Sequence, residues 1–351
     1  MKSLYQSVLL CVATLLPQTL FAGQVEHLYQ ADVAATSSAS VWQQDAFRQV
    51  LAKVSGQENV HQQAKINEEM RRVAGYIKQF EAVRSAEGNR MRVLLDAAKV
   101  NQLLQQNNIA VWGALRPDIL VWLVEQQGAQ RQFVRQNTHS FYQALRQAFA
   151  QTALPLLQPL YDIDDLLSLS ETDVWAGFWQ PLEQASARYN ADVVIAATLE
   201  HLQQDGGALY RLSWQRNDNG RIQRDEVSAD NEAALMQAFA WKLAQQLAAN
   251  YATVLSATPA QFVLQINGLT DLAAIVQVQK ILQQLIGVSG VTISAYQNGS
   301  ARYTLNSGVD AQGLISALRF NPQLRLQPQL SLPQLDVSAL PVLATLEYTK
   351  H

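Results

Sequence analysis

The clearest pattern of apolar and polar positions lies near the end of the chain. Apolar residues alternate over 262–266, recur every three or four positions over 272–285, and alternate again in "GVTISAYQ" and "ARYTLNS". Asn298-Gly299, between the last two segments, predicts a tight hairpin. A helix over "VDAQGLISALRF" and a strand at "LRLQP" complete the order βαββαβ, which predicts a ferredoxin-like domain over residues 257–328.

The patterns that precede this segment predict two further units. Residues 23–114 combine a helix over "VWQQDAFRQVLAKVSG" with strands that meet at Glu87-Gly88-Asn89, which predicts a small N-terminal α+β domain. In residues 115–256, "DILVWLV" and "ADVVIAATLEHL" are apolar on successive positions, as expected for strands covered on both faces. Helical segments separate these strands, so this part is predicted to be a central α/β sheet domain.

The two ends of the chain differ from these units. The first 22 residues, "MKSLYQSVLLCVATLLPQTLFA", have the charged start, short apolar run and small final residue of a signal peptide cleaved near Ala22. Cys11 lies in that run and is lost on cleavage. Residues 329–351 have prolines at 333 and 341, so we expect an extended C-terminal tail. No other stretch approaches the roughly 20 apolar residues that a membrane-spanning helix needs.

These features favour the periplasm of a Gram-negative bacterium. A chain without cysteine after cleavage must be stabilised by burial, and its length allows that. The charge is nearly balanced, with 26 Lys and Arg against 29 Asp and Glu. Nucleic-acid binding needs clustered basic residues, so we expect no nucleic-acid partner.

No metal site or cofactor is predicted. The five histidines are dispersed, and no two have the helical spacing of metal ligands. The densest group of acids, "DIDDLLSLSETD" from Asp162 to Asp173, lacks the central glycine of a calcium loop. We therefore expect these acids to cap short helices.

Catalytic motifs are also missing from the sequence. It contains no Gly-x-Ser-x-Gly nucleophile turn and no helix with paired histidines and a glutamate. A hydrolase remains an alternative only if a cleft gathers His139 or His201 with a serine and an acid. We therefore expect a protein that binds and does not catalyse.

The N-terminal motifs resemble a family of unknown function. "LYQADVAA", "DAFRQVLAKVSG" and the later "RPDILVWLVEQQ" resemble domain of unknown function family 2066, whose members are uncharacterised exported gammaproteobacterial proteins. The resemblance covers most of the mature chain and implies no activity, catalytic residue or cofactor. "YNADVVIAATLEHL" with "YRLSWQRNDNGRI" is similar to docking domains of envelope proteins, namely the periplasmic protein of the Tol system and lipoprotein activators of penicillin-binding proteins.

Two binding functions follow from these observations. The first is a periplasmic adaptor that docks envelope proteins. The alternative is peptidoglycan binding, because the βαββαβ segment resembles the glycan-binding repeat domains of cell-division proteins. We expect the binding surface to include Trp214, between Arg211 and Arg216, and an exposed sheet face. That face is predicted to present Gln265, Tyr296 and Tyr303.

Overall fold

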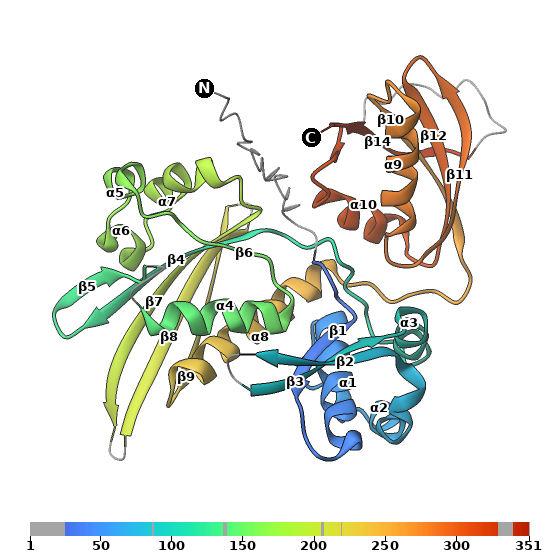
Figure 1. Cartoon of the computed structure of the whole chain (residues 1–351). Coiled ribbons are helices and arrows are strands. Elements are labelled where there is room, and N and C mark those ends of the chain that lie inside the picture. Colours follow the sequence, from blue (N-terminus) through green and yellow to red (C-terminus); the bar gives the residue numbers. More distant parts are fainter. Residues whose placement is uncertain are drawn as a thin grey trace, which may run out of the picture.

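The computed structural model describes residues 25–350 except 86–87, 136–138, 205–206, 219 and 329–339. Within these residues, three β-sheets and ten α-helices form a mixed α/β chain, which confirms the predicted class at this level (Figure 1). The predicted signal peptide lies outside the described residues. No helix in the described part is both long and apolar enough to cross a membrane.

The N-terminal unit packs helix α1 against a three-stranded antiparallel sheet of order β1-β3-β2. Trp42, Phe47 and Val54 of α1 are buried, and the helix ends where Gly56 takes the left-handed conformation, with φ 69°. The elements in chain order are β1 (Gln30–Ala34), α1 (Ala39–Ser55), η1 (Val60–Gln62), α2 (Ala64–Glu69), η2 (Met70–Tyr76), β2 (Ile77–Ser85), β3 (Gly88–Leu95) and α3 (Ala97–Gln106).

The central unit is a sheet of order β5-β4-β7-β8-β9, with the short β6 paired to β4. Strands β4 and β7 are parallel, and the first seven residues of β4 are all buried, as its continuous apolar run predicts. The elements are β4 (Ile119–Gln127), β5 (Gln130–Phe133), α4 (Ser140–Thr152), β6 (Leu156–Leu157), α5 (Ile163–Ser168), α6 (Glu171–Ala176), α7 (Trp179–Ser186), η3 (Ala187–Tyr189), β7 (Val193–Gln204), β8 (Gly207–Asp218), β9 (Arg221–Ala229) and α8 (Glu232–Tyr251).

Helices cover both faces of the central sheet. On one face, α4 and α8 contribute Phe149 and Phe239 to a core with Ile119 of β4. On the other face, Val174 of α6 and Leu182 of α7 pack with Trp122 of β4. Alternation along β4 thus divides its side chains between two cores.

The C-terminal unit has the predicted element order but a different sheet. Its elements are β10 (Ala260–Asn267), α9 (Leu272–Gln283), β11 (Val288–Gln297), β12 (Ser300–Ser307), α10 (Ala311–Arg319), β13 (Leu324–Leu326) and β14 (Val342–Tyr348). The sheet order is β11-β12-β10-β14-β13, so β14 lies between β10 and β13. β14 runs parallel to β10 and antiparallel to β13.

Strand β14 corrects the prediction of an extended tail over residues 329–351. Ala344, Leu346 and Tyr348 alternate with partly exposed residues and are buried in the core. The prolines at 333 and 341 precede this alternating stretch and do not interrupt it. The rest of the predicted tail, residues 329–339, lies outside the described part.

The N-terminal and C-terminal units share one apolar core. A single cluster of buried side chains includes Leu104 of α3, Val111 and Leu255 of the connecting segments, and Leu264 of β10. The two connecting segments are fastened by an antiparallel bridge, in which Val111 and Thr253 exchange backbone hydrogen bonds of 2.7 and 3.0 Å. The three units therefore meet at these segments.

Candidate functional site

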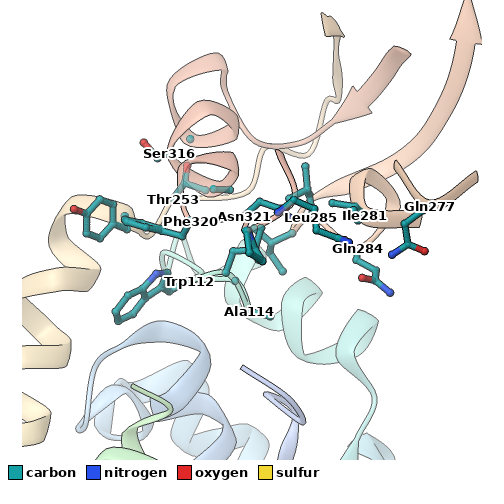
Figure 2. A pocket seen from close by; sticks show the side chains of 18 residues that line it. Trp112, Ala114, Thr253, Gln277, Ile281, Gln284, Leu285, Ser316, Phe320 and Asn321 are labelled. Atoms are coloured by element: carbon teal, nitrogen blue, oxygen red, sulfur yellow. The ribbon is translucent and has the colours of Figure 1, made fainter. Parts of the chain in front are cut away.

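A pocket of about 100 Å³ lies where the C-terminal unit meets the two connecting segments (Figure 2). Its wall is formed by the segment 112–115, the end of α8, and helices α9 and α10. None of the described residues that line it is charged. The lining residues are the aromatic Trp112, Tyr251 and Phe320, the aliphatic Ala114, Leu115, Ile281, Leu285, Ile286 and Ala317, and the polar Thr253, Gln277, Gln284, Ser316, Asn321 and Gln323, with Gly113, Gly313 and Pro322.

Trp112 is a deeply buried side chain of the pocket wall. It is 1% exposed, and its indole Nε1 has no hydrogen-bond partner among the described residues. The guanidinium of Arg116 lies 4.1 Å from the ring centroid. An unpaired buried N–H carries a free-energy cost.

Two further contacts shape the walls. Tyr251, the last residue of α8, meets Phe320 edge to face at 4.9 Å between ring centroids. Gly113 allows close approach of the C-terminal unit, because a Cβ there would lie 3.2 Å from the Ile286 side chain. The pocket therefore depends on the seating of α9 and α10 against the connecting segments.

Arg116 holds the junction beside the pocket. The side chain is fully buried, and this burial lowers the pKa of the guanidinium. It donates hydrogen bonds of 2.6 to 3.2 Å to the backbone carbonyls of Lys53, Trp112, Gly113, Thr152 and Ala153. These carbonyls belong to the end of α1, the connecting segment and the end of α4, so one cation satisfies two helix termini.

The residues predicted from sequence do not gather at this pocket. Trp214 is 4% exposed, which corrects the prediction that it lies near a surface. Alternation along β8 places Leu212, Trp214 and Arg216 on the face covered by α8, where Phe239 lies 4.8 Å from the Trp214 ring. The arginines beside Trp214 in sequence therefore gave a misleading surface signal.

The three residues predicted for one exposed sheet face lie on two faces. Tyr303 is fully buried on the helix-covered face and donates a 3.1 Å hydrogen bond to the carbonyl of Ile275. Tyr296 is 51% exposed at the edge strand and donates to the carbonyl of Leu269 before α9. Gln265 is half-buried and alternates with the core residue Leu264, so it lies on the opposite face.

The structure does bring both candidate histidines to one acid. Glu125 is fully buried, and its carboxylate oxygens lie 2.6 Å from Nε2 of His139 and 2.5 Å from Nε2 of His201. Gln132 donates a third hydrogen bond at 3.1 Å. The adjacent serine, Ser140, instead donates to Glu232, so no serine of the described residues completes a triad at this cluster.

The histidine contacts keep Glu125 ionised. Burial by itself raises the pKa of its carboxyl group, but hydrogen bonds from His201 and Gln132, with the nearby His139, outweigh burial. The pKa of Glu125 is therefore lowered. In the described part of the chain, no group of three His, Cys, Asp or Glu residues is placed to hold a metal ion.

We expect Glu125→Gln to lower the free energy of unfolding by about 3 kcal/mol at pH 7. The amide NH2 of glutamine cannot accept a hydrogen bond, so it would face a group that donates to the Glu125 carboxylate. Since the folded-state pKa of Glu125 is depressed, its contribution is complete above the unfolded pKa of about 4.3 and is lost as pH falls through the folded value. Urea unfolding between pH 3 and 7 measures this. Glu200→Gln, at a partly exposed pair with Arg211, is the control and should change stability by under about 0.5 kcal/mol. Equal stability of Glu125→Gln and the parent would contradict the expectation.

Two of the five acids from Asp162 to Asp173 cap helices, as the sequence predicts for the group. Asp162 accepts from the backbone N–H of Asp165 at the start of α5. Ser170 and Asp173 form a capping box at the start of α6. These two carboxylates therefore bind backbone N–H groups within three residues of their own position.

Comparison with known proteins finds a family match for the N-terminal unit only. Residues 22–113, about a quarter of the chain, match a family described as a domain of unknown function (DUF8605). This match overturns the resemblance to domain of unknown function family 2066, whose N-terminal motifs lie inside the same residues. A strand followed by an amphipathic helix recurs in many α+β units, so those motifs discriminate poorly. No curated protein and no solved structure matches the chain.

Proposed function

We propose that this chain is a non-catalytic adaptor of the bacterial cell envelope, exported to the periplasm, and that its junction pocket receives an uncharged side chain of a partner protein. The observation that carries the proposal is the lining of the pocket, which is aromatic, aliphatic and amide-bearing without a charged group. An ionic ligand would enter it without a counter-charge, at a high desolvation cost.

The size of the pocket supports a single side chain as the ligand. A cavity of about 150 Å³ in another protein holds benzene, so a pocket of about 100 Å³ suits a leucine-sized group. Buried aromatic pockets at domain interfaces commonly serve as anchoring points for a partner chain.

In this function the three units act as domains, and the C-terminal unit acts as a ferredoxin-like recognition domain enlarged by β14. In this arrangement α9 and α10 form one wall of the pocket, and the connecting segments form the other. A partner bound there contacts the C-terminal unit and the connecting segments together. Binding should therefore stabilise their relative position.

Glycan binding is a second candidate, favoured by the open face of the C-terminal sheet. Gln265, Thr304, Asn306 and Thr345 alternate with core residues and are half-buried. Such uncharged side chains can donate to and accept from sugar hydroxyls. The burial of Tyr303 removes one of the two stacking residues expected there.

Site-specific photo-crosslinking tests the adaptor proposal. A photo-crosslinking amino acid is placed at position 277, at one end of the lining residues (Figure 2). The protein is then incubated with the envelope fraction of the source organism and irradiated. We expect a discrete crosslinked protein, and we expect Ser316→Phe, which fills the pocket, to weaken that product by at least about fivefold. The full mature chain is used.

Matched controls separate the pocket from its surroundings. Gln312→Phe adds the same ring to an exposed position of α10 that does not line the pocket, and it should leave the crosslink unchanged. A crosslink that persists in Ser316→Phe contradicts the pocket as the binding site. Salt-resistant sedimentation with peptidoglycan sacculi, without a protein crosslink, would instead support the glycan-binding candidate.

A further inference from the structure

Helix α5 and the residues just before it expose an unusual amount of apolar surface. Ile163 and Leu167, one turn apart, are 75% and 81% exposed, and Leu160 is 62% exposed. Leu166 is 40% exposed. We call these four residues the α5 apolar face. Contiguous exposed apolar side chains on a folded protein usually mark a contact surface.

The orientation of α5 is the reverse of that in an ordinary surface helix, which buries its apolar side. Its buried residue is the acid Asp165, at 1% exposure. The Asp165 carboxylate accepts hydrogen bonds from the backbone N–H of Tyr161 at 2.8 Å and the Tyr189 hydroxyl at 2.5 Å. These bonds hold the polar side of the helix inward, so Ile163 and Leu167 stay in solvent.

The charge around this face is mainly negative, although one cation, Arg188, lies beside it. Between Leu160 and Phe178 the sequence contains five acids and no lysine or arginine. The nearby Arg188 pairs with Asp162 at 2.8 Å and with Asp165 at 3.4 Å. The Asp164 side chain is 82% exposed, 3.8 Å from the same guanidinium. Exposed acids at the edge of this face repel an anionic lipid surface and attract a positively charged protein surface.

We infer that the α5 apolar face docks a positively charged amphipathic helix of a partner protein. Apolar side chains of that helix cover Ile163 and Leu167, and its Lys or Arg residues face Asp164 and the acids of α6. This surface lies on the helix layer of the central unit, apart from the junction pocket (Figure 1), and the inference does not depend on the proposed function of that pocket. It assigns the adaptor a second contact.

Binding of a designed peptide to the full mature chain tests the inference. The probe is an amphipathic helical peptide of about 18 residues made of Leu and Lys, long enough to form a helix on binding. Its counterpart replaces Lys with Glu. We expect the Leu/Lys peptide to bind and the Leu/Glu peptide not to bind, with affinity that falls as salt is raised.

Two double variants locate the binding. Ile163→Ser with Leu167→Ser should raise the Kd at least about tenfold, because it removes the apolar anchors. Leu272→Ser with Val276→Ser alters another pair one turn apart on exposed positions, 75% and 42%, and should change the Kd less than about twofold. All of these side chains are exposed, so we expect both variants to fold, which circular dichroism verifies.

Three results would overturn the inference. They are failure of the Leu/Lys peptide to bind, equal weakening by both double variants, and preferential binding of the parent chain to vesicles of anionic lipid. The last would mark the face as a membrane contact.

Discussion

Arg116→Met should lower the free energy of unfolding by on the order of 4 kcal/mol, although it exchanges a buried charge for an apolar side chain of similar length. Five backbone carbonyls would lose their charged donor at once. Those at the end of α4, on Thr152 and Ala153, belong to buried residues, so each carries a desolvation cost without a partner. Urea unfolding followed by tryptophan fluorescence measures the change.

Conservative and surface variants show whether the geometry of Arg116 matters. Arg116→Lys keeps the charge but lacks the planar fork that reaches several carbonyls, so we expect about half the loss. Arg48→Met breaks an exposed pair with Asp45 and should cost less than about 0.5 kcal/mol. If Arg116→Met unfolds at the same urea concentration as the parent, the carbonyls are satisfied in another way and the clamp is not needed.

Removal of residues 341–351 should unfold the C-terminal unit. The deletion takes out β14, which supplies three core residues and hydrogen-bonds to both β10 and β13. One buried Leu or Tyr contributes about 2–3 kcal/mol, so the loss is on the order of 5 kcal/mol or more. Since Trp112 lies at the junction, its fluorescence should report that α9 and α10 have left the connecting segments.

Point variants on adjacent positions of β14 provide the control. Leu346→Ala empties a fully buried site and should lower stability by about 3 kcal/mol. Thr345→Ala lies on the other face of the same strand, half-buried, and should cost under about 1 kcal/mol. Equal effects of the two, or protease resistance of residues 257–328 in the truncated chain, would show that β14 is a dispensable arm.

The shared core of the N-terminal and C-terminal units bears on the adaptor proposal. Because Val111 and Leu255 bridge the two units, the pocket walls are not independent bodies joined by a loose linker. A pocket with supported walls loses less entropy when a partner binds. The α5 apolar face is likewise held by the bonds to Asp165, so both proposed contacts are preorganised.

Local pattern was sufficient to predict many elements. The continuous apolar run at residues 119–124 becomes a strand covered on both faces, and the Asn298-Gly299 turn joins β11 to β12. Asp162 and Asp173 cap helices. These features depend on neighbours within a few residues, which is the range that periodicity and capping rules describe.

The candidate site was not predictable in this way. The pocket draws side chains from residues 112–115, 251–253, 277–286 and 313–323, and only the docking of the units brings them together. Glu125, His139 and His201 are likewise separated by up to 76 positions. The position of Trp214 was missed because the strand pattern fixes alternation but does not say which face α8 covers.

The sequence by itself determined many of the helices and strands and their order along the chain, because these follow from local spacing, capping and turn chemistry. Tertiary structure alone decided that β14 enters the middle of a sheet, that Arg116 joins two helix ends, and that leucines of α5 face solvent while Asp165 is buried. Each of these depends on which distant surfaces exclude water from one another. That choice is made by the packed chain as a whole, since the same residue is favourable inside or outside according to the partners it finds there.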